Sequence, residues 1–142
     1  PFPSTATGGD GANTRATILQ LASLCAERGV DVLTVANTQP IQDSRLAVGS
    51  GGLSGKLVYD AMLRMVREMR EAVGESISIN AVGGIFSGRD AFEALSAGAD
   101  TVQILTSLIY RGPGIVRSIN KELSHILELN GIKSVSEIRH AT

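Results

Sequence analysis

The sequence predicts an α/β protein in which three parallel strands are flanked by helices. Three short runs, residues 30–36, 76–82 and 101–105, are rich in apolar and β-branched side chains, as buried strands are. Longer stretches with apolar residues at helical spacing precede, separate and follow these runs. Strands that alternate with helices pair in parallel through right-handed crossovers, so the order indicates one parallel sheet.

Composition narrows the function classes. The 142 residues suffice for one domain, and a net charge of −1 leaves no electrostatic footprint for nucleic acid. No apolar run reaches the roughly 18 residues that span a bilayer. The single cysteine, Cys25, excludes an internal disulfide framework and a cysteine-cluster metal site. The chain opens without Met and is expected to be a piece of a longer protein.

The first part of the chain holds one helix and the first strand. Residues 1–13 lack periodicity and are expected to form a flexible loop or the remnant of an insertion, whereas residues 14–142 form the folded part. The stretch 14–28 predicts a helix with an apolar face made of Ile18, Leu21, Ala22 and Cys25. The strand 30–36 follows and is expected to be buried on both faces. It ends at Asn37 and Thr38, whose polar side chains suit either a small planar ligand or simple turn chemistry.

A long glycine-rich loop and a second helix come next. Residues 40–57 are expected to form a functional or mobile loop. They imitate a P-loop at Gly55-Lys56, but Leu57 stands where Ser or Thr is needed. The helix 58–73 is expected to place its methionines in the core, with its solvated face formed by Arg64, Arg67, Glu68, Arg70 and Glu71.

A strand, a glycine turn and a helix start together predict an anion site. Gly83 and Gly84 follow the strand 76–82 and let the backbone approach a ligand closely. Ser87 can cap the helix 87–97, whose free N–H groups and positive dipole end then face the turn. Phosphate is the usual anion in such a place.

The remaining elements complete the pattern. The strand 101–105 leads into a short helical turn at Thr106-Ser107, and further helices are expected over 113–130 and 134–140. Three βα units are too few for a (β/α)₈ barrel, which takes about 250 residues. The phosphate site of such barrels lies after the last two strands, where this chain has Gly83-Gly84 and Thr106. The sequence therefore predicts the C-terminal portion of a (β/α)₈ TIM barrel, completed by a separate N-terminal portion.

Several motifs in their order resemble the C-terminal part of dihydroorotate dehydrogenase, over roughly residues 20–140. They are Gly51-Gly52-Leu53-Ser54-Gly55-Lys56, Ala81-Val82-Gly83-Gly84-Ile85-Phe86-Ser87-Gly88, Ala97-Gly98-Ala99 and Val102-Gln103-Ile104, with Val35-Ala36-Asn37-Thr38 similar to the family's Asn-Thr strand end. The Gly-Gly-Leu-Ser-Gly form matches the class 2, quinone-dependent branch. The Gly-Ile-Phe-Ser-Gly wording resembles members from apicomplexan parasites.

This resemblance implies an FMN enzyme that oxidises dihydroorotate to orotate in pyrimidine biosynthesis. It implies that Asn37 and Thr38 contact substrate and that Asn37 also lies near the flavin. The other implied contacts to FMN and its phosphate are Ser54, Gly55, Val82, Gly83, Gly84, Leu105 and Thr106. It also implies a ubiquinone-type acceptor, membrane association through the missing portion only, and a place at the mitochondrial inner membrane.

The chain departs from the family pattern at three points. Leu105 stands where the family usually has Tyr, and Ala36 stands where relatives often have Thr. The family's catalytic-base serine, flavin-contacting lysine and quinone tunnel belong to the N-terminal portion, so no catalytic base and no metal ligand is assigned in this chain. Two alternatives stay open: another phosphate-binding TIM-barrel oxidoreductase, and a non-catalytic half-barrel that only binds.

Overall fold

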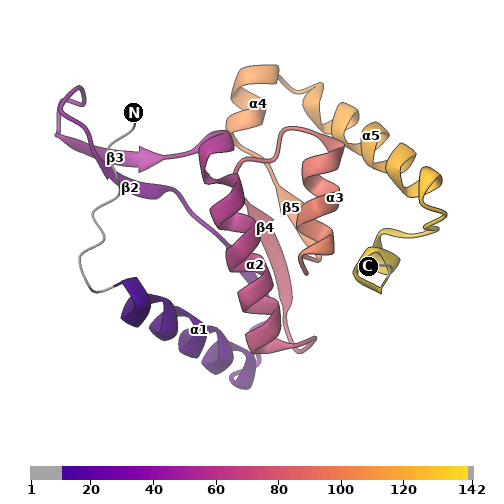
Figure 1. The fold of residues 1–142 in the computed structure, drawn as a ribbon, viewed down its shortest axis with the longest axis horizontal. Helices are drawn as coiled ribbons and strands as arrows, with labels where there is room; N and C mark the ends of the chain where they lie inside the picture. The colour runs from indigo at the N-terminus through magenta and orange to yellow at the C-terminus, as the bar shows by residue number, and fades with distance from the viewer. Residues whose placement is uncertain (1–10, 141–142) are drawn as a thin grey trace.

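A computed structural model describes residues 11–140 of the chain (Figure 1). Five strands and seven helical segments follow one another along these residues. They are α1 (Gly11–Glu27), β1 (Val32–Val35), β2 (Gln39–Gln42), β3 (Ser50–Leu53), η1 (Gly55–Val58), α2 (Tyr59–Val73), β4 (Ser78–Val82), α3 (Gly88–Ser96), β5 (Thr101–Gln103), α4 (Thr106–Arg111), α5 (Ile115–Leu129) and η2 (Val135–His140).

The three predicted strands form one parallel sheet, which confirms the α/β prediction. Their order is β1-β4-β5, and Thr34, Asn80 and Thr101 lie side by side across it. The Asn80 side chain donates to Thr34 Oγ1 at 3.4 Å and accepts from Thr101 Oγ1 at 3.0 Å. Because the three strands are parallel, their carboxyl ends lie at the same end of the sheet, which is where α/β proteins place their ligands.

Helices cover one face of this sheet and build the core with it. Helix α2 packs on β1 and β4, and α3 packs on β5 and α5 (Figure 1). Ile79 and Ala81 of β4 are fully buried against Met62 and Val66 of α2. Met69 is also buried and Met65 packs against the cluster, so the methionines fill the core as predicted. Cys25 is half-buried and packs against the same core.

The opposite face of the sheet is open, which corrects the prediction that the first strand is buried on both faces. Val32 is 52% exposed, and Thr34, Thr101 and Gln103 are exposed as well. Three strands bury only the face on which their own helices pack, and burial of the other face needs additional chain.

Residues 40–57 do not form an irregular loop as predicted. Strands β2 and β3 pair antiparallel within this stretch, with Ile41 opposite Gly51, and η1 follows them. The turn between the strands is closed by Asp43, which accepts from Arg45 N at 2.9 Å and forms an ion pair with the Arg45 guanidinium at 2.6 Å.

Some side chains also differ from prediction. Arg70 does not lie on the solvated face of α2, because its guanidinium is folded inward onto carbonyl groups and Asp100. Leu21 is 58% exposed although the helical spacing placed it inward. Helix α1 begins at Gly11 instead of residue 14, and residues 1–10 of the predicted flexible stretch lie outside the described residues.

Candidate functional site

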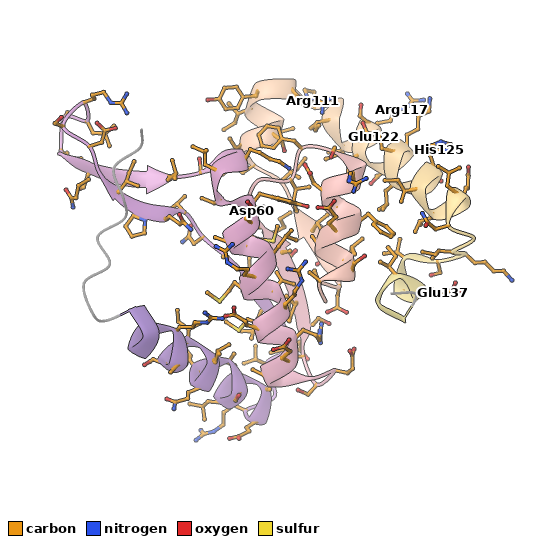
Figure 2. The ribbon with its side chains drawn as sticks, viewed as in Figure 1. Asp60, Arg111, Arg117, Glu122, His125 and Glu137 are labelled. Carbon is orange, nitrogen blue, oxygen red and sulfur yellow. The ribbon has the colours of Figure 1, made fainter. Side chains whose placement is uncertain are left out.

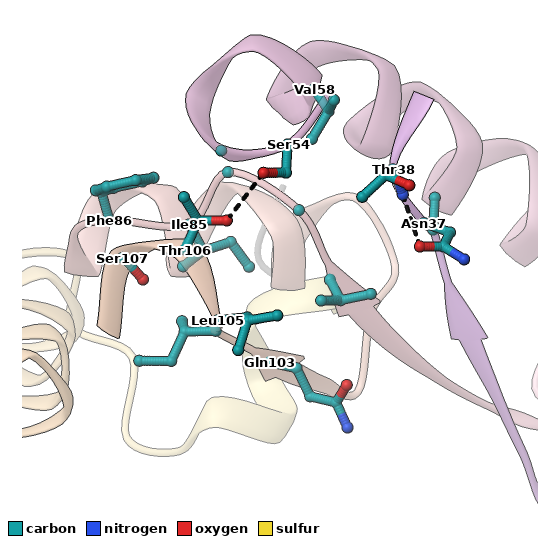
Figure 3. A pocket seen from close by; sticks show the side chains of 16 residues that line it. Asn37, Thr38, Ser54, Val58, Ile85, Phe86, Gln103, Leu105, Thr106 and Ser107 are labelled. Carbon is teal, nitrogen blue, oxygen red and sulfur yellow. Dashed lines mark hydrogen bonds between the residues drawn. The ribbon is translucent and has the colours of Figure 1, made fainter. Parts of the chain in front are cut away.

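A pocket of about 520 Å³, open solvent included, lies at the carboxyl ends of the three parallel strands (Figure 3). It is lined by all nine residues singled out from the sequence as ligand contacts. These are Asn37, Thr38, Ser54, Gly55, Val82, Gly83, Gly84, Leu105 and Thr106. They come from four separate stretches of chain, so the fold brings together what the sequence spreads over 70 positions.

The glycine turn after β4 approaches the loop after β3 as closely as backbone permits. Gly84 has φ +72°, and a Cβ there would lie 2.7 Å from Tyr59 Cβ and 2.8 Å from the Gly55 carbonyl oxygen. Gly55 has φ +77°, and a Cβ there would lie 3.2 Å from Thr106 Cγ2. Only glycine fits these positions without displacing a neighbour.

Polar groups gather at two ends of the pocket. Thr106 Oγ1 donates to Ser54 Oγ at 3.4 Å, which joins the loop after β3 to the start of α4. Asn37 and Thr38 lie at the other end (Figure 3), where Asn37 Oδ1 accepts from Thr38 N at 2.7 Å. Both side chains are exposed, so their polar groups are accessible at this end of the pocket.

Ser107 is one of the pocket residues that the sequence does not single out as a ligand contact. It is 1% exposed, and its hydroxyl has no hydrogen-bond partner among the described residues. Leaving a buried hydroxyl unpaired costs about 1–3 kcal/mol. The clue in the sequence is a second hydroxyl beside Thr106, directly after a strand end.

The predicted anion site at the start of α3 is wrong in one respect. Ser87 caps the helix as predicted, since its Oγ accepts from Asp90 N at 3.1 Å. However, the protein's own carboxylates occupy the other donors: Asp90 Oδ2 accepts from Phe86 N at 2.9 Å and Glu122 Oε2 from Gly88 N at 2.7 Å. Glu122 reaches over from α5 (Figure 2). The positive dipole end of α3 therefore already faces two carboxylates of the protein itself.

The glycine turn itself keeps free donors. Within residues 11–140, neither Gly83 N nor Gly84 N donates to another group of the protein. Arg111 of α4 steadies the turn from outside, with Nη1 donating to Phe86 O at 2.8 Å (Figure 2). The anion-binding capacity of this end thus rests on the glycine backbone and nearby hydroxyls.

The described residues contain neither a candidate metal centre nor a membrane-spanning helix. Across the part of the chain that the structure describes, no cluster of three His, Cys, Asp or Glu side chains is placed to hold a metal ion. No helix within residues 11–140 combines the length and apolar character needed to cross a bilayer.

The fold and pocket define the class: an α/β protein of parallel βα units whose glycine-lined pocket lies at the strands' carboxyl ends. Comparison with known proteins narrows this class. The family model described as Dihydroorotate dehydrogenase matches residues 13–127. The chain therefore belongs to the dihydroorotate dehydrogenase family.

Curated relatives carry the name dihydroorotate dehydrogenase (quinone). The protein from Allorhizobium ampelinum is 37% identical over 123 residues, which are 84% of this chain and 34% of that protein. The mouse protein, whose name adds "mitochondrial", is 37% identical over 121 residues, or 82% of this chain and 31% of its own length. The chain thus spans about a third of the length of these relatives.

Solved structures give the same result. A crystal structure of DHODH from Eimeria tenella in complex with ferulenol superimposes with a TM-score of 0.78 at 34% identity, covering 87% of this chain and 34% of that one. The ligand-free enzyme from the same organism gives a TM-score of 0.76 at 35% identity, covering 84% and 34%. The chain is the C-terminal portion of a (β/α)₈ barrel, as predicted.

Proposed function

We propose that this chain supplies the FMN-phosphate site and part of the substrate site of a quinone-dependent dihydroorotate dehydrogenase. The enzyme would oxidise (S)-dihydroorotate to orotate in de novo pyrimidine biosynthesis. The observation that carries the proposal is the meeting of all nine expected contact residues in one pocket of a chain from this family. FMN, when bound, supplies the redox chemistry, and the residues of this chain bind and orient it.

The glycine end of the pocket fits a phosphate dianion. Gly83 and Gly84 offer backbone donors in a turn that has no room for a Cβ at Gly84. Thr106 and the unpaired Ser107 hydroxyl add donors beside it. Backbone donors and hydroxyls can hold a phosphate without a cationic side chain. Val82, Ser54, Gly55 and Leu105 complete the proposed FMN contacts.

The opposite end of the pocket suits a small planar substrate. Asn37 and Thr38 lie there, directly after β1 and on the opposite side of the pocket from Thr106 (Figure 3). The amide of Asn37 and the hydroxyl of Thr38 carry donors of the kind that match the carbonyl and carboxylate oxygens of dihydroorotate. Asn37 would also border the flavin.

The remaining parts of the enzyme are assigned to chain outside this sequence. We place the catalytic base, the ubiquinone-type acceptor site and any membrane association in an N-terminal portion that completes the barrel. The match covers only about a third of each relative's length, which supports such a portion. The name of the mouse relative supports a mitochondrial place, and the inner membrane is part of the proposal.

The test is oxidation of dihydroorotate by the full-length protein with a ubiquinone analogue as acceptor. Replacing Asn37 with Ala should lower kcat/KM by roughly 10²-fold, because a directed donor to the reacting substrate is lost. Asn120→Ala, on the exposed face of α5, is the matched control and should leave activity unchanged. Wild-type protein that oxidises another substrate but not dihydroorotate would favour a different phosphate-binding barrel enzyme. Protein that binds FMN without any turnover would favour a non-catalytic half-barrel.

A further inference from the structure

One charged pair joins the two loops that form the phosphate end of the pocket. Lys56 lies in η1, directly after Gly55, and Asp90 lies in the first turn of α3. Lys56 Nζ is 2.6 Å from Asp90 Oδ1, across 34 positions of sequence. The Asp90 side chain is only 12% exposed, whereas that of Lys56 is 55% exposed.

The second carboxylate oxygen of Asp90 reaches the other loop. It accepts from Phe86 N at 2.9 Å, two residues after Gly84. One carboxylate thus contacts both the segment that follows Gly55 and the turn that follows Gly84.

Tyr59 reinforces the same junction. Its ring lies under Lys56, with Nζ 3.8 Å from the ring centroid, a favourable cation–π distance. Its hydroxyl lies 3.1 Å from Asp90 O and 3.0 Å from Glu93 Oε2, and its Cβ is the group that a Cβ on Gly84 would meet first. Lys56, Tyr59 and Asp90 therefore form one contact network around the backbone of Gly55 and Gly84.

We propose that Lys56 and Asp90 are positioning residues for the phosphate of FMN. Their ion pair sets the spacing between the Ser54-Gly55 loop and the Gly83-Gly84 turn, so that donors from both face one dianion. Neither side chain contacts the phosphate: the charge of Lys56 is taken up by Asp90. This inference rests on the proposed function, because it assumes that the dianion is the FMN phosphate.

The experiment compares FMN with riboflavin, which lacks the phosphate, in the flavin-free full-length protein. Quenching of flavin fluorescence gives both dissociation constants. Lys56→Met and Asp90→Asn should each weaken FMN binding about 10-fold, as expected for loss of a hydrogen-bond-sized contribution. The double variant should be no weaker than either single variant, because both remove the same contact. Binding of riboflavin should change less than about twofold in all three.

Two further variants sharpen the result. Arg89→Met removes a neighbouring surface ion pair, that of Arg89 Nε with Glu93 Oε1 at 2.9 Å, and should leave FMN binding unchanged. Lys56→Arg keeps the charge and should restore most of the FMN affinity that Lys56→Met loses. Lys56→Met should fold because the Lys56 side chain is half-exposed. Asp90→Asn should fold because Asn keeps an oxygen that can accept from Phe86 N.

Three outcomes would overturn the positioning role. FMN binding that is unchanged in Lys56→Met would show that the pair does not set the site. Equal weakening of FMN and riboflavin would show a general structural effect. Tighter FMN binding in Asp90→Asn would show that Lys56, once released, contacts the phosphate directly. By contrast, wild-type protein that binds riboflavin as tightly as FMN would contradict the proposed phosphate site itself.

Discussion

Gly84 is enclosed by Tyr59 and Gly55 and has a left-handed backbone conformation. Gly84→Ala should weaken FMN binding at least 10-fold, because the new methyl group must displace the Gly55 or Tyr59 side of the pocket. Gly131→Ala is the matched control: φ there is +68°, and a Cβ would meet nothing within 4 Å. Gly131→Ala should lose about 1 kcal/mol of stability from backbone strain alone, and Gly84→Ala should lose more because of its close contacts. FMN titration and urea unfolding separate the two effects, and equal FMN binding in both variants would contradict a tight glycine cradle.

Removing the Ser107 hydroxyl should have opposite effects on the stability of the flavin-free protein and on its affinity for FMN. Its hydroxyl is buried and unpaired among the described residues, so Ser107→Ala should leave the flavin-free protein as stable or more stable by up to about 1–2 kcal/mol. The same change should weaken FMN about 5-fold, because a donor to the phosphate is lost. Thermal melts with and without FMN measure both. A variant that is less stable without FMN and binds it normally would place the hydroxyl outside the phosphate site.

The buried hydroxyl of Tyr59 should make the folding stability depend on pH in alkaline solution. Burial, together with the hydrogen bond to Glu93, raises the pKa of its hydroxyl far above the ordinary value of about 10. The folded state therefore keeps the proton at a pH where the unfolded state releases it, and folding stability should fall as the pH rises above about 10. In Tyr59→Phe this decline should be shallower. Urea unfolding at a series of pH values checks it, and parallel profiles would contradict the assigned pKa direction.

At the scale of single residues, the sequence predicts which residues line the ligand pocket better than it predicts which side chains are buried. Gly84 and Thr106 were selected because of what their side chains lack or carry at a strand end, and both line the pocket. Helical spacing puts Arg70 on the solvent face of α2, because the spacing gives only an angle around the helix axis and not where a long side chain bends. Ser107 was missed because nothing in its neighbours shows that its hydroxyl is buried.

At the scale of secondary-structure elements, Arg70 of α2 contacts the segments that precede β4 and β5, at the end of the sheet opposite the pocket. Its guanidinium donates to Gly98 O at 2.9 Å and Ile77 O at 3.1 Å, and pairs with Asp100 at 2.6 Å. The side chain is 13% exposed. It thereby fastens the end of α2 to the segments that lead into β4 and β5.

Arg70→Met should lower the free energy of unfolding by about 2–3 kcal/mol, because Gly98 O, Ile77 O and Asp100 lose the guanidinium. Asp100 still accepts from Ile79 N at 2.7 Å, which limits the loss. Arg67→Met, on the exposed face of the same helix, should change it by less than about 0.5 kcal/mol. FMN affinity should stay unchanged in both, since Arg70 lies far from the glycine turn along β4. Urea unfolding and flavin titration give the comparison. Similar stabilities for the two variants would contradict the fastening role.

The helices and parallel strands followed from periodicity, whereas the β2–β3 hairpin did not. Residues 39–42 and 50–53 have few β-branched side chains and two glycines, so no alternating pattern marks them. Their pairing depends on the turn that Asp43 closes with Arg45 and on backbone bonds from Asp43 N to Gly49 O at 3.0 Å. The hydrogen bonds from Arg45 lower the pKa of Asp43 to about 2, so its carboxylate keeps its charge in mildly acidic solution. Such pairing is tertiary information that propensity does not carry.

At the scale of the whole molecule, the open face of the sheet is explained by the length of the chain. Strands β1 and β5 form the sheet's two edges within the described residues, and Val32, Leu105, Ile109 and Tyr110 are exposed near them. The chain spans only about a third of the length of its relatives. In a closed barrel these edges pair with further strands, which removes the exposed backbone groups. The count of three βα units in the sequence was enough to predict this incompleteness. The source organism remains a prediction.

The assignment of the pocket to FMN and dihydroorotate is tested most directly by the visible absorbance spectrum of the purified full-length protein, recorded before and after dihydroorotate is added without oxygen. The expected result is a flavin spectrum from one FMN per protein, whose visible band disappears when dihydroorotate is added and returns with a quinone. A protein without flavin, or a flavin band that dihydroorotate leaves unchanged, would contradict it.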